Sequence, residues 1–295
     1  MLKKILAIAL TLVTLNTYSV EPKVFQLWEN DKPPVENGLQ ATDEKMENPR
    51  WISGVAKGEL FVYPAPDPNG IALIMCPGGG YGGLSILHEG KSMAQPLNDL
   101  GVTLAVVKYR MPNQHSQVPA DDVNRAYDIL RENAEIWGID PDKIGIGGAS
   151  AGGHLASTIA THSEVNNFKP AFQMLLYPVI SMQDDLTHKG SKTNLLGKNP
   201  TPELVAYYSN DLQVTPQTPP AFIAVSGDDT VVPVMNSINY FNALNDNGVP
   251  VSLHVYPKGN HGWGYNTELG EEQMWWKEFT YWLSTLYPNK NIPKY

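Results

Sequence analysis

The sequence predicts an α/β fold in which helices cover both faces of a doubly wound, mainly parallel β-sheet. Two observations predict this fold class. Apolar segments of strand length alternate along the chain with segments of helical periodicity. Several of these strand-length segments are apolar throughout, as expected for strands buried on both faces of a parallel sheet. The chain has 295 residues, 42% of them hydrophobic, which suits one large domain with a substantial core.

The expected elements follow one another from about residue 58 onwards. Strands are expected at 60–63, 71–76, 102–107, 143–147, 172–177, 221–225 and 251–256. Helices are expected in a segment that ends at 100, and at 119–137, 151–161, 234–245 and 271–286. In the helix at 119–137, apolar residues recur at spacings of three and four and form one face. Asp121 and Asp122 lie in its first turn, where the helix dipole favours negative charge, and Gly138 ends it.

The remaining segments define the domain organisation. Residues 1–19 contain two lysines, an apolar stretch too short to span a membrane, and small residues near the end, which is typical of a secretory signal peptide. Residues 20–57 are rich in proline, asparagine and charge, so we expect an irregular N-terminal arm. The catalytic domain is expected at 58–295, with a short insertion at 181–220 near the active site. The signal peptide predicts a secreted or periplasmic protein that has no membrane attachment after cleavage.

Composition argues against several other classes of function. The chain has 21 Lys+Arg against 30 Asp+Glu, and its formal net charge of −9 disfavours binding to nucleic acid. There is no H-E-x-x-H motif and no cysteine cluster, so we predict no metal site. The single cysteine, Cys76, ends an apolar run and is expected to be buried.

The strongest chemical signal is the motif Gly-Ala-Ser-Ala-Gly at 148–152, which lies between an expected strand and an expected helix. A nucleophilic serine needs such a tight turn, and glycines two residues away on either side let the backbone pass close to its neighbours. This context predicts that Ser150 is a nucleophile. The N-terminus of the following helix would then point at a developing oxyanion, and the N–H of Ala151 is a predicted donor to it.

A serine hydroxyl needs a base, and the base needs a carboxylate to orient it. His261 lies in a glycine-rich loop after the last expected strand, and we predict that it is the base. The acid is expected in the loop after the strand at 221–225, where Asp228 and Asp229 compete. We favour Asp229 because it is closer to the next helix, and Asp228 is the alternative that otherwise forms a turn.

The loop after the strand at 71–76 is expected to complete the site. It reads Pro-Gly-Gly-Gly-Tyr, and glycines allow backbone N–H groups to face a pocket. We predict that Gly79 and Gly80 are oxyanion-hole donors. Tyr81 is a candidate for the acyl pocket or a packing residue, and Tyr81 and Trp263 are the predicted aromatic substrate-binding residues.

The same loop also fits the dinucleotide-binding pattern G-x-G-x-x-G at 78–83. That pattern expects an acidic residue at the end of the next strand, which here ends in Val107-Lys108. It also leaves the serine, aspartate and histidine without a role, so the hydrolase interpretation is preferred.

Together these residues resemble the carbohydrate-esterase branch of the α/β-hydrolases, which includes bacterial acetylxylan esterase-like and feruloyl esterase-like proteins. The resemblance extends from about residue 58 and is carried by CPGGGY (76–81), KYRMP (108–112), WGIDP (137–141), GASAGGH (148–154), LLYP (175–178), TPP (218–220) and HVYPKGNHG (254–262). It implies an α/β-hydrolase fold without a large cap domain, a triad of Ser150, Asp229 and His261, a backbone oxyanion hole and no cofactor. The implied substrate is an ester, such as an acylated oligo- or polysaccharide.

Three other functions remain as alternatives. A general carboxylesterase or lipase of small esters would use the same residues. A peptidase of the prolyl-oligopeptidase type shares the order of the triad, but it usually carries a large extra domain. A non-catalytic binding module would usually lack a triad residue, and this chain has all three. The sequence predicts no oligomeric state.

Overall fold

The computed structural model describes residues 21–29, 31–162, 165–266, 274–288, 290 and 292. The predicted signal peptide at 1–19 lies outside the described residues, as does the start of the helix expected at 271–286. Within the described part, no helix combines the length and hydrophobicity that crossing a bilayer requires.

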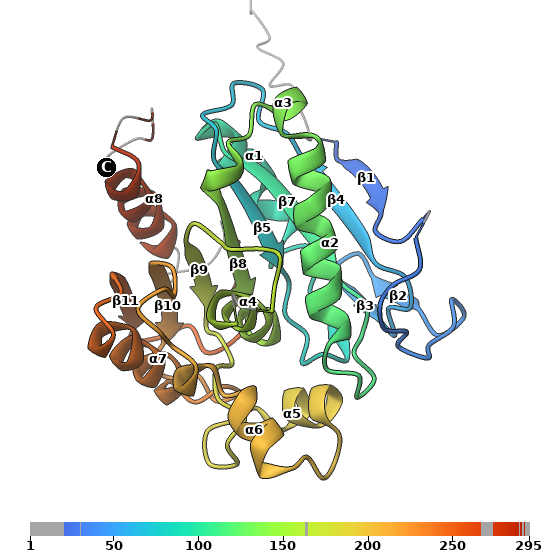
Figure 1. Cartoon of the computed structure of the whole chain (residues 1–295). Helices are drawn as coiled ribbons and strands as arrows, with labels where there is room; N and C mark the ends of the chain where they lie inside the picture. The colour runs from blue at the N-terminus through green and yellow to red at the C-terminus, as the bar shows by residue number, and fades with distance from the viewer. Residues whose placement is uncertain are drawn as a thin grey trace, which may run out of the picture.

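Eight strands of the described chain form one sheet (Figure 1). In order across the sheet they are β1 (Lys23–Gln26), β4 (Glu59–Tyr63), β7 (Thr103–Lys108), β5 (Ala72–Cys76), β8 (Ile144–Ala149), β9 (Gln173–Leu176), β10 (Ala221–Ser226) and β11 (Val251–Tyr256). The strands from β7 to β11 are parallel to one another, whereas β1 and β4 pair antiparallel at one edge. The predicted doubly wound, mainly parallel sheet is therefore confirmed.

The central strands are buried on both faces. Every residue of β5, β7, β8, β9 and β10 is buried, which explains why their sequences are apolar runs rather than alternating patterns. The hydrophobic core is continuous over these strands and the helices that cover them.

The α-helices are α1 (Ala94–Asp99), α2 (Val118–Glu132), α3 (Ala134–Trp137), α4 (Ala151–Thr161), α5 (Lys189–Leu196), α6 (Pro202–Tyr207), α7 (Met235–Asp246) and α8 (Met274–Leu286). Short 3-10 helices lie at η1 (Lys91–Met93), η2 (Pro141–Lys143) and η3 (Asn210–Leu212). Figure 1 shows α2 and α4 together in front of the sheet. The insertion expected at 181–220 carries α5 and α6, which lie below α4 in Figure 1, at the end of the sheet where β8 leads into that helix.

Helices α7 and α8 cover opposite faces of the sheet. Phe222 of β10 packs its ring against Phe279 of α8, and it pairs in register with Met174 of β9. The preceding residue of β9, Gln173, points to the other face, where it accepts a hydrogen bond from Tyr240 of α7. Helices on both faces are the arrangement that the strand–helix alternation predicts.

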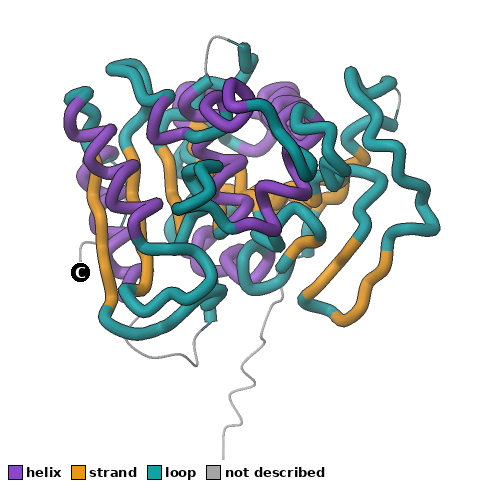
Figure 2. Tube along the Cα trace, turned by 90° about the horizontal axis from the view of Figure 1, so that it is seen from below, coloured by secondary structure: helices purple, strands orange, loops and turns teal. Residues whose placement is uncertain are grey.

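The N-terminal arm, which we expected to be irregular over 20–57, contains three short strands between loops. It contributes β1 to the main sheet, and β2 (Lys45–Asn48) and β3 (Trp51–Ser53) form a second, three-stranded sheet with β6 (Gly83–Leu84). Figure 2 shows this small sheet at the side of the molecule away from the C-terminus. The sequence did not reveal these strands because they are only three or four residues long and mostly exposed, so they carry no apolar pattern.

The helix expected at 119–137 is divided. Helix α2 ends at Glu132, Asn133 leaves helical geometry with φ −109° and ψ 9°, and α3 resumes at Ala134. Gly138 ends α3 in the left-handed conformation at φ 61°, as the sequence predicted. Both pieces keep the predicted apolar face against the core, so the break did not alter the periodicity.

Candidate active site

The parallel strands bring the predicted residues to one edge of the sheet. Register pairs Cys76 with Gly148, Ala149 with Leu176, and Ser226 with Tyr256, so the strands end side by side. The loops that follow these carboxyl ends carry the glycine loop, the serine, the aspartates and the histidine. Open parallel sheets place their sites at this edge.

Ser150 lies at the apex of a tight turn between β8 and α4. Its backbone has φ 52° and ψ −120°, a conformation that residues with a side chain rarely adopt. A Cβ at Gly148 would lie 2.1 Å from the carbonyl oxygen of Gly152, and one at Gly152 would lie 2.0 Å from that of Cys76. Only glycine therefore fits at the two outer positions of the motif, and the turn presents the serine hydroxyl at the end of the strand.

Ser150, His261 and Asp229 form a hydrogen-bonded chain. The His261 Nε2 atom lies 2.9 Å from Ser150 Oγ, and its Nδ1 atom lies 2.7 Å from Asp229 Oδ2. The Asp229 side chain is fully buried, whereas the His261 side chain is 13% exposed. With the imidazole proton on Nδ1, facing the carboxylate, Nε2 is free to accept the hydroxyl proton. This geometry suits activation of a serine nucleophile.

The two neighbouring aspartates have different partners. Asp229 Oδ1 accepts hydrogen bonds from the N–H groups of Val231 and Val232, at 2.8 and 2.9 Å, which hold its other oxygen toward the imidazole. Asp228 instead accepts a hydrogen bond from the N–H of Asn260 at 2.8 Å. Asp229 is therefore the aspartate that contacts the imidazole, and Asp228 anchors the loop just before His261.

The glycine loop lies directly beside the serine. A Cβ at Gly78 would lie 2.8 Å from the Cβ of Ser150. Gly79 and Gly80 have φ values of 137° and 63°, and a Cβ at Gly79 would lie 2.1 Å from the carbonyl oxygen of Gly83. The N–H groups of Gly79 and Gly80 have no acceptor among the described residues. These two amides are thus available to a bound substrate.

The third predicted donor is the N–H of Ala151. Ala151 is the first residue of α4, and the first N–H groups of a helix have no partner within the helix. The residue is fully buried next to the nucleophile. The helix N-terminus also adds partial positive charge at this point, which favours an anion.

Neither predicted substrate-binding aromatic residue has an open face. Tyr81 is 2% exposed, and its hydroxyl lies 2.8 Å from His154 Nδ1. Trp263 is 4% exposed, and its indole N–H donates a hydrogen bond to Ser226 Oγ. The prediction that these rings offer a surface to sugars is wrong, because both are packed below the site in the core.

Two residues that the sequence did not single out connect the loops of the site. Glu89 is buried, and its Oε2 accepts the N–H of Gly78 while its Oε1 accepts the hydroxyl of Tyr177, each at 2.8 Å. The same tyrosine oxygen accepts the N–H of Gly264 at 2.8 Å, and its ring lies 4.7 Å from the His261 ring. The glycine loop is therefore bonded to the Glu89 carboxylate directly, and the histidine loop is connected to the same carboxylate through the Tyr177 hydroxyl. Burial and the nearby Glu89 charge raise the pKa of Tyr177, so it stays a neutral donor.

The glycine loop does not have the geometry of a dinucleotide site. After Gly80 the chain enters the short strand β6, whereas the dinucleotide pattern requires a helix to begin within the motif. Within the described ranges, no group of three or more His, Cys, Asp or Glu residues is arranged to hold a metal ion. Cys76 is buried, and burial raises the pKa of its thiol.

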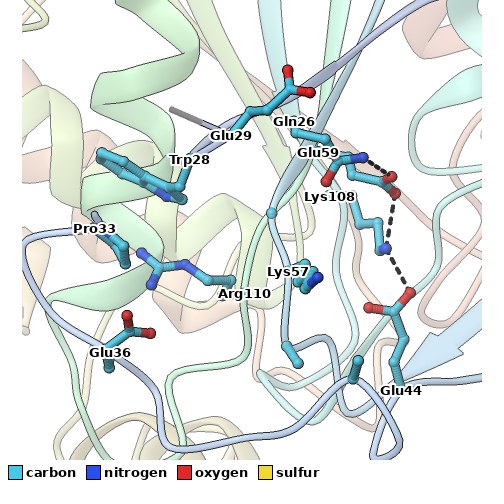
Figure 3. A pocket seen from close by; sticks show the side chains of 13 residues that line it. Gln26, Trp28, Glu29, Pro33, Glu36, Glu44, Lys57, Glu59, Lys108 and Arg110 are labelled. Atoms are coloured by element: carbon cyan, nitrogen blue, oxygen red, sulfur yellow. Dashed lines mark hydrogen bonds and ion pairs between the residues drawn. The ribbon is translucent and has the colours of Figure 1, made fainter. Parts of the chain in front are cut away.

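A separate cavity of about 640 Å³ lies between the N-terminal arm and the strands β4 and β7 (Figure 3). Its lining includes none of the residues of the candidate active site. Lys108 donates to Glu44 and Glu59 there, at 2.6 and 2.8 Å, and Figure 3 shows these contacts. Arg110 forms a buried ion pair with Asp122. The Lys108–Glu44 pair attaches the arm to the sheet, whereas the Arg110–Asp122 pair joins the sheet to α2, and both are structural contacts.

Residues 73–264 match the family described as the alpha/beta hydrolase fold, and this span covers most of the chain. The chain belongs to the α/β-hydrolase family. The resemblance inferred from the motifs is thereby confirmed at the level of the family, and the glycine loop, the serine turn and His261 all lie within the matched residues.

Several known α/β hydrolases and related proteins are similar to this chain. An acetylxylan esterase of Xylanibacter ruminicola is 38% identical over 239 residues, which are 80% of this chain and 50% of that protein. The endo-1,4-beta-xylanase B of Butyrivibrio fibrisolvens is 36% identical over 69% of this chain and 34% of its own length. The chain thus spans about half or less of these two relatives. The crystal structure of an acetyl ester-xyloside bifunctional hydrolase from Caldicellulosiruptor lactoaceticus has a TM-score of 0.77 and 34% identity, covering 90% of this chain and 96% of that one.

Proposed function

We propose that this chain is a serine carboxylic-ester hydrolase that removes acetyl or other acyl groups from plant polysaccharide such as acetylxylan. The observation that carries the proposal is the continuous hydrogen-bonded path from Ser150 through His261 to Asp229, with separations of 2.9 and 2.7 Å. The amides of Gly79 and Gly80, which have no acceptor among the residues the structure describes, lie in the loop beside Ser150, as an oxyanion hole requires.

The reaction proceeds by two acyl transfers. His261 Nε2 takes the proton of Ser150 as Oγ attacks the ester carbonyl, and Asp229 stabilises the imidazolium that forms. The N–H groups of Gly79, Gly80 and Ala151 hold the carbonyl oxygen while it is negatively charged. The imidazolium then gives its proton to the alcohol oxygen as that group leaves. Water, deprotonated by His261, attacks the acyl-serine, and the acid is released as the proton returns to Oγ.

Two observations support an acylated polysaccharide as the substrate. The similar proteins include an acetylxylan esterase, a xylanase and an acetyl ester-xyloside hydrolase; all three names refer to xylan or a xyloside, and two of them refer to an acetyl ester. The insertion at 181–220 contains the short helices α5 and α6 and the 3-10 helix η3, and it is too short to form a large lipase cap. A site with a small cover accommodates an ester attached to a bulky polymer.

The location of the protein is part of the proposal. The lysines and the apolar stretch in residues 1–19 support export by a cleaved signal peptide, which would place the enzyme in the periplasm or outside the cell, where polysaccharide is encountered. N-terminal sequencing of the protein recovered from the periplasm or medium tests this point. An intact N-terminus on protein confined to the cytoplasm would contradict it.

Acetate release from acetylated xylan, compared with hydrolysis of p-nitrophenyl esters of increasing chain length, tests the substrate. We expect acetate release and a preference for short acyl chains. A fluorophosphonate probe should label the wild type at Ser150, and Ser150→Ala should lower kcat by at least about 10⁴-fold with the fold retained. Labelling elsewhere, or wild-type turnover by the variant, would overturn the mechanism, and a preference for long chains would overturn the polysaccharide substrate.

A further inference from the structure

His188 lies where the insertion meets the glycine loop. It is the residue immediately before α5, and a Cβ at Gly80 would lie 3.4 Å from its Cε1 atom. The same helix is attached to the loop by Asn194, whose Nδ2 donates to the carbonyl oxygen of Gly80 at 2.8 Å. This hydrogen bond holds α5, and with it His188 at its N-terminus, beside the loop of the predicted oxyanion donors.

The segment before His188 is attached to the other side of the site. Asn236, near the start of α7 and after the Asp229 loop, donates from Nδ2 to the carbonyl oxygen of Leu186 at 2.8 Å. The His188 ring is also close enough to Asp229 and His261 to feel both charges. His188 thus lies beside the glycine loop, within electrostatic reach of the aspartate and histidine loops.

The contacts of the ring determine which nitrogen carries the proton. His188 Nδ1 accepts the backbone N–H of Ser191 at 3.3 Å and lies 2.9 Å from its Oγ. In the neutral ring the proton is therefore on Nε2, which has no hydrogen-bond partner in the described part of the chain. Burial and the positive charge that His261 acquires lower the pKa of His188, and Asp229 opposes this only in part. The ring is thus a neutral donor during turnover.

We propose that His188 is a specificity-determining residue, whose Nε2–H donates a hydrogen bond to a hydroxyl group on the alcohol part of the ester. This inference rests on the proposed function. The ring lies beside the loop of the predicted oxyanion donors and within electrostatic reach of His261, from which the leaving alcohol receives its proton. In a sugar ester, the carbon next to the esterified one can carry a free hydroxyl, so a donor at this position meets an acceptor that a simple alkyl ester lacks.

The choice of variant must separate this role from that of a helix cap. His188 caps α5 by accepting the N–H of Ser191 through its side chain. Serine is also a favoured N-cap residue but has no group that reaches as far as Nε2. His188→Ser therefore retains the cap and removes the donor. Lys189→Ala, an exposed change at the next residue of the same helix, is the matched control.

The test compares a monoacetylated methyl xyloside that has a free hydroxyl beside the ester with its deoxy analogue lacking that hydroxyl. We expect the wild type and Lys189→Ala to prefer the hydroxyl-bearing ester in kcat/KM by about three- to tenfold, the change that one neutral hydrogen bond gives. In His188→Ser this preference should fall below about twofold, mainly through KM. Thermal unfolding of each variant confirms that α5 is retained.

Two outcomes would overturn the inference alone. The first is an unchanged preference in His188→Ser, and the second is an equal loss on both esters, which would mean that the ring acts on the acyl part or on the fold. A wild type that hydrolyses neither ester nor p-nitrophenyl acetate would instead overturn the proposed function, and this inference would fall with it.

Discussion

Replacing Glu89 by glutamine tests the buried link between the two halves of the site. The Glu89 carboxylate accepts one hydrogen bond from the N–H of Gly78 and one from the hydroxyl of Tyr177, each at 2.8 Å. Glutamine offers one acceptor oxygen and one NH₂ group, so one of these two donors must face another donor. The tyrosine cannot compensate by rotating its hydroxyl, because its oxygen already accepts the N–H of Gly264 and its proton would then have no acceptor.

The magnitude follows from the loss of one hydrogen bond to a charged group, which contributes about 1.5–3 kcal/mol. The free energy of unfolding should fall by that amount, which corresponds to a decrease in Tm of roughly 3–10 °C for a domain of this size. The glycine loop is one of the two partners, so its amides should shift away from the carbonyl oxygen. We therefore expect kcat for p-nitrophenyl acetate to fall by about tenfold or more, since losing an oxyanion donor outright costs about 10²–10³.

Circular dichroism thermal unfolding and steady-state kinetics of Glu89→Gln measure both effects. Glu132→Gln is the matched control, because Glu132 is 59% exposed on α2 and its ion pair with Arg125 lies at the surface. Such pairs contribute at most about 1 kcal/mol, so this control should retain its activity. If Glu89→Gln were as stable and as active as the control, the carboxylate would not be accepting both donors and the proposed link would be refuted.

Three further predictions address other parts of the site and core. Ser150→Gly should unfold at a higher temperature than Ser150→Ala. The positive φ costs a residue with a Cβ of order 1–3 kcal/mol, whereas the extra backbone entropy that glycine loses on folding costs only about 0.5–1 kcal/mol. Equal or reversed melting temperatures would contradict this prediction. Asp229→Asn should lower kcat by roughly 10³–10⁴-fold and Asp228→Asn by less than about tenfold, and the opposite ranking would reassign the acid. Burial lowers the pKa of His154 to about 4 from an ordinary 6.5, so the unfolded chain binds a proton at a higher pH than the folded chain. The contribution of His154 to the free energy of unfolding should be fully present above pH 6.5 and should fall by about 3 kcal/mol as the pH drops to 4. Urea titrations at several pH values should show that the His154→Gln variant lacks this pH dependence.

The elements that the sequence predicted best are those with a strong local signal. The helix expected at 151–161, which follows the serine motif, and the strand expected at 251–256, which lies between two prolines, have these bounds in the structure. The break at Asn133 lies inside a continuous apolar pattern, and the exposed strands of the N-terminal arm have no pattern at all. Local periodicity therefore predicts neither the helix break nor the exposed strands.

The site shows the same division. The Gly148–Gly152 turn is recognisable because two close backbone contacts require glycine at fixed positions. Trp263 was misassigned because an aromatic residue beside a histidine looks the same in sequence whether its ring is buried or exposed. Glu89 and His188 were not found from the sequence, because what connects each of them to the site, Tyr177 for Glu89 and the glycine loop for His188, is far away along the chain.

By itself the sequence determined the α/β class, the order of the strands along the chain, and which loops carry the serine, the aspartates and the histidine. Only the tertiary structure decided that Asp229 rather than Asp228 contacts the imidazole, that Tyr81 and Trp263 are core residues, and that one buried carboxylate connects the glycine loop to the histidine loop. The physical reason is the range over which each effect acts. Local propensity and periodicity act over a few residues. Burial and hydrogen bonding at the carboxyl edge of a parallel sheet depend on loops that are far apart along the chain, as those of Ser150 and His261 are by more than a hundred residues.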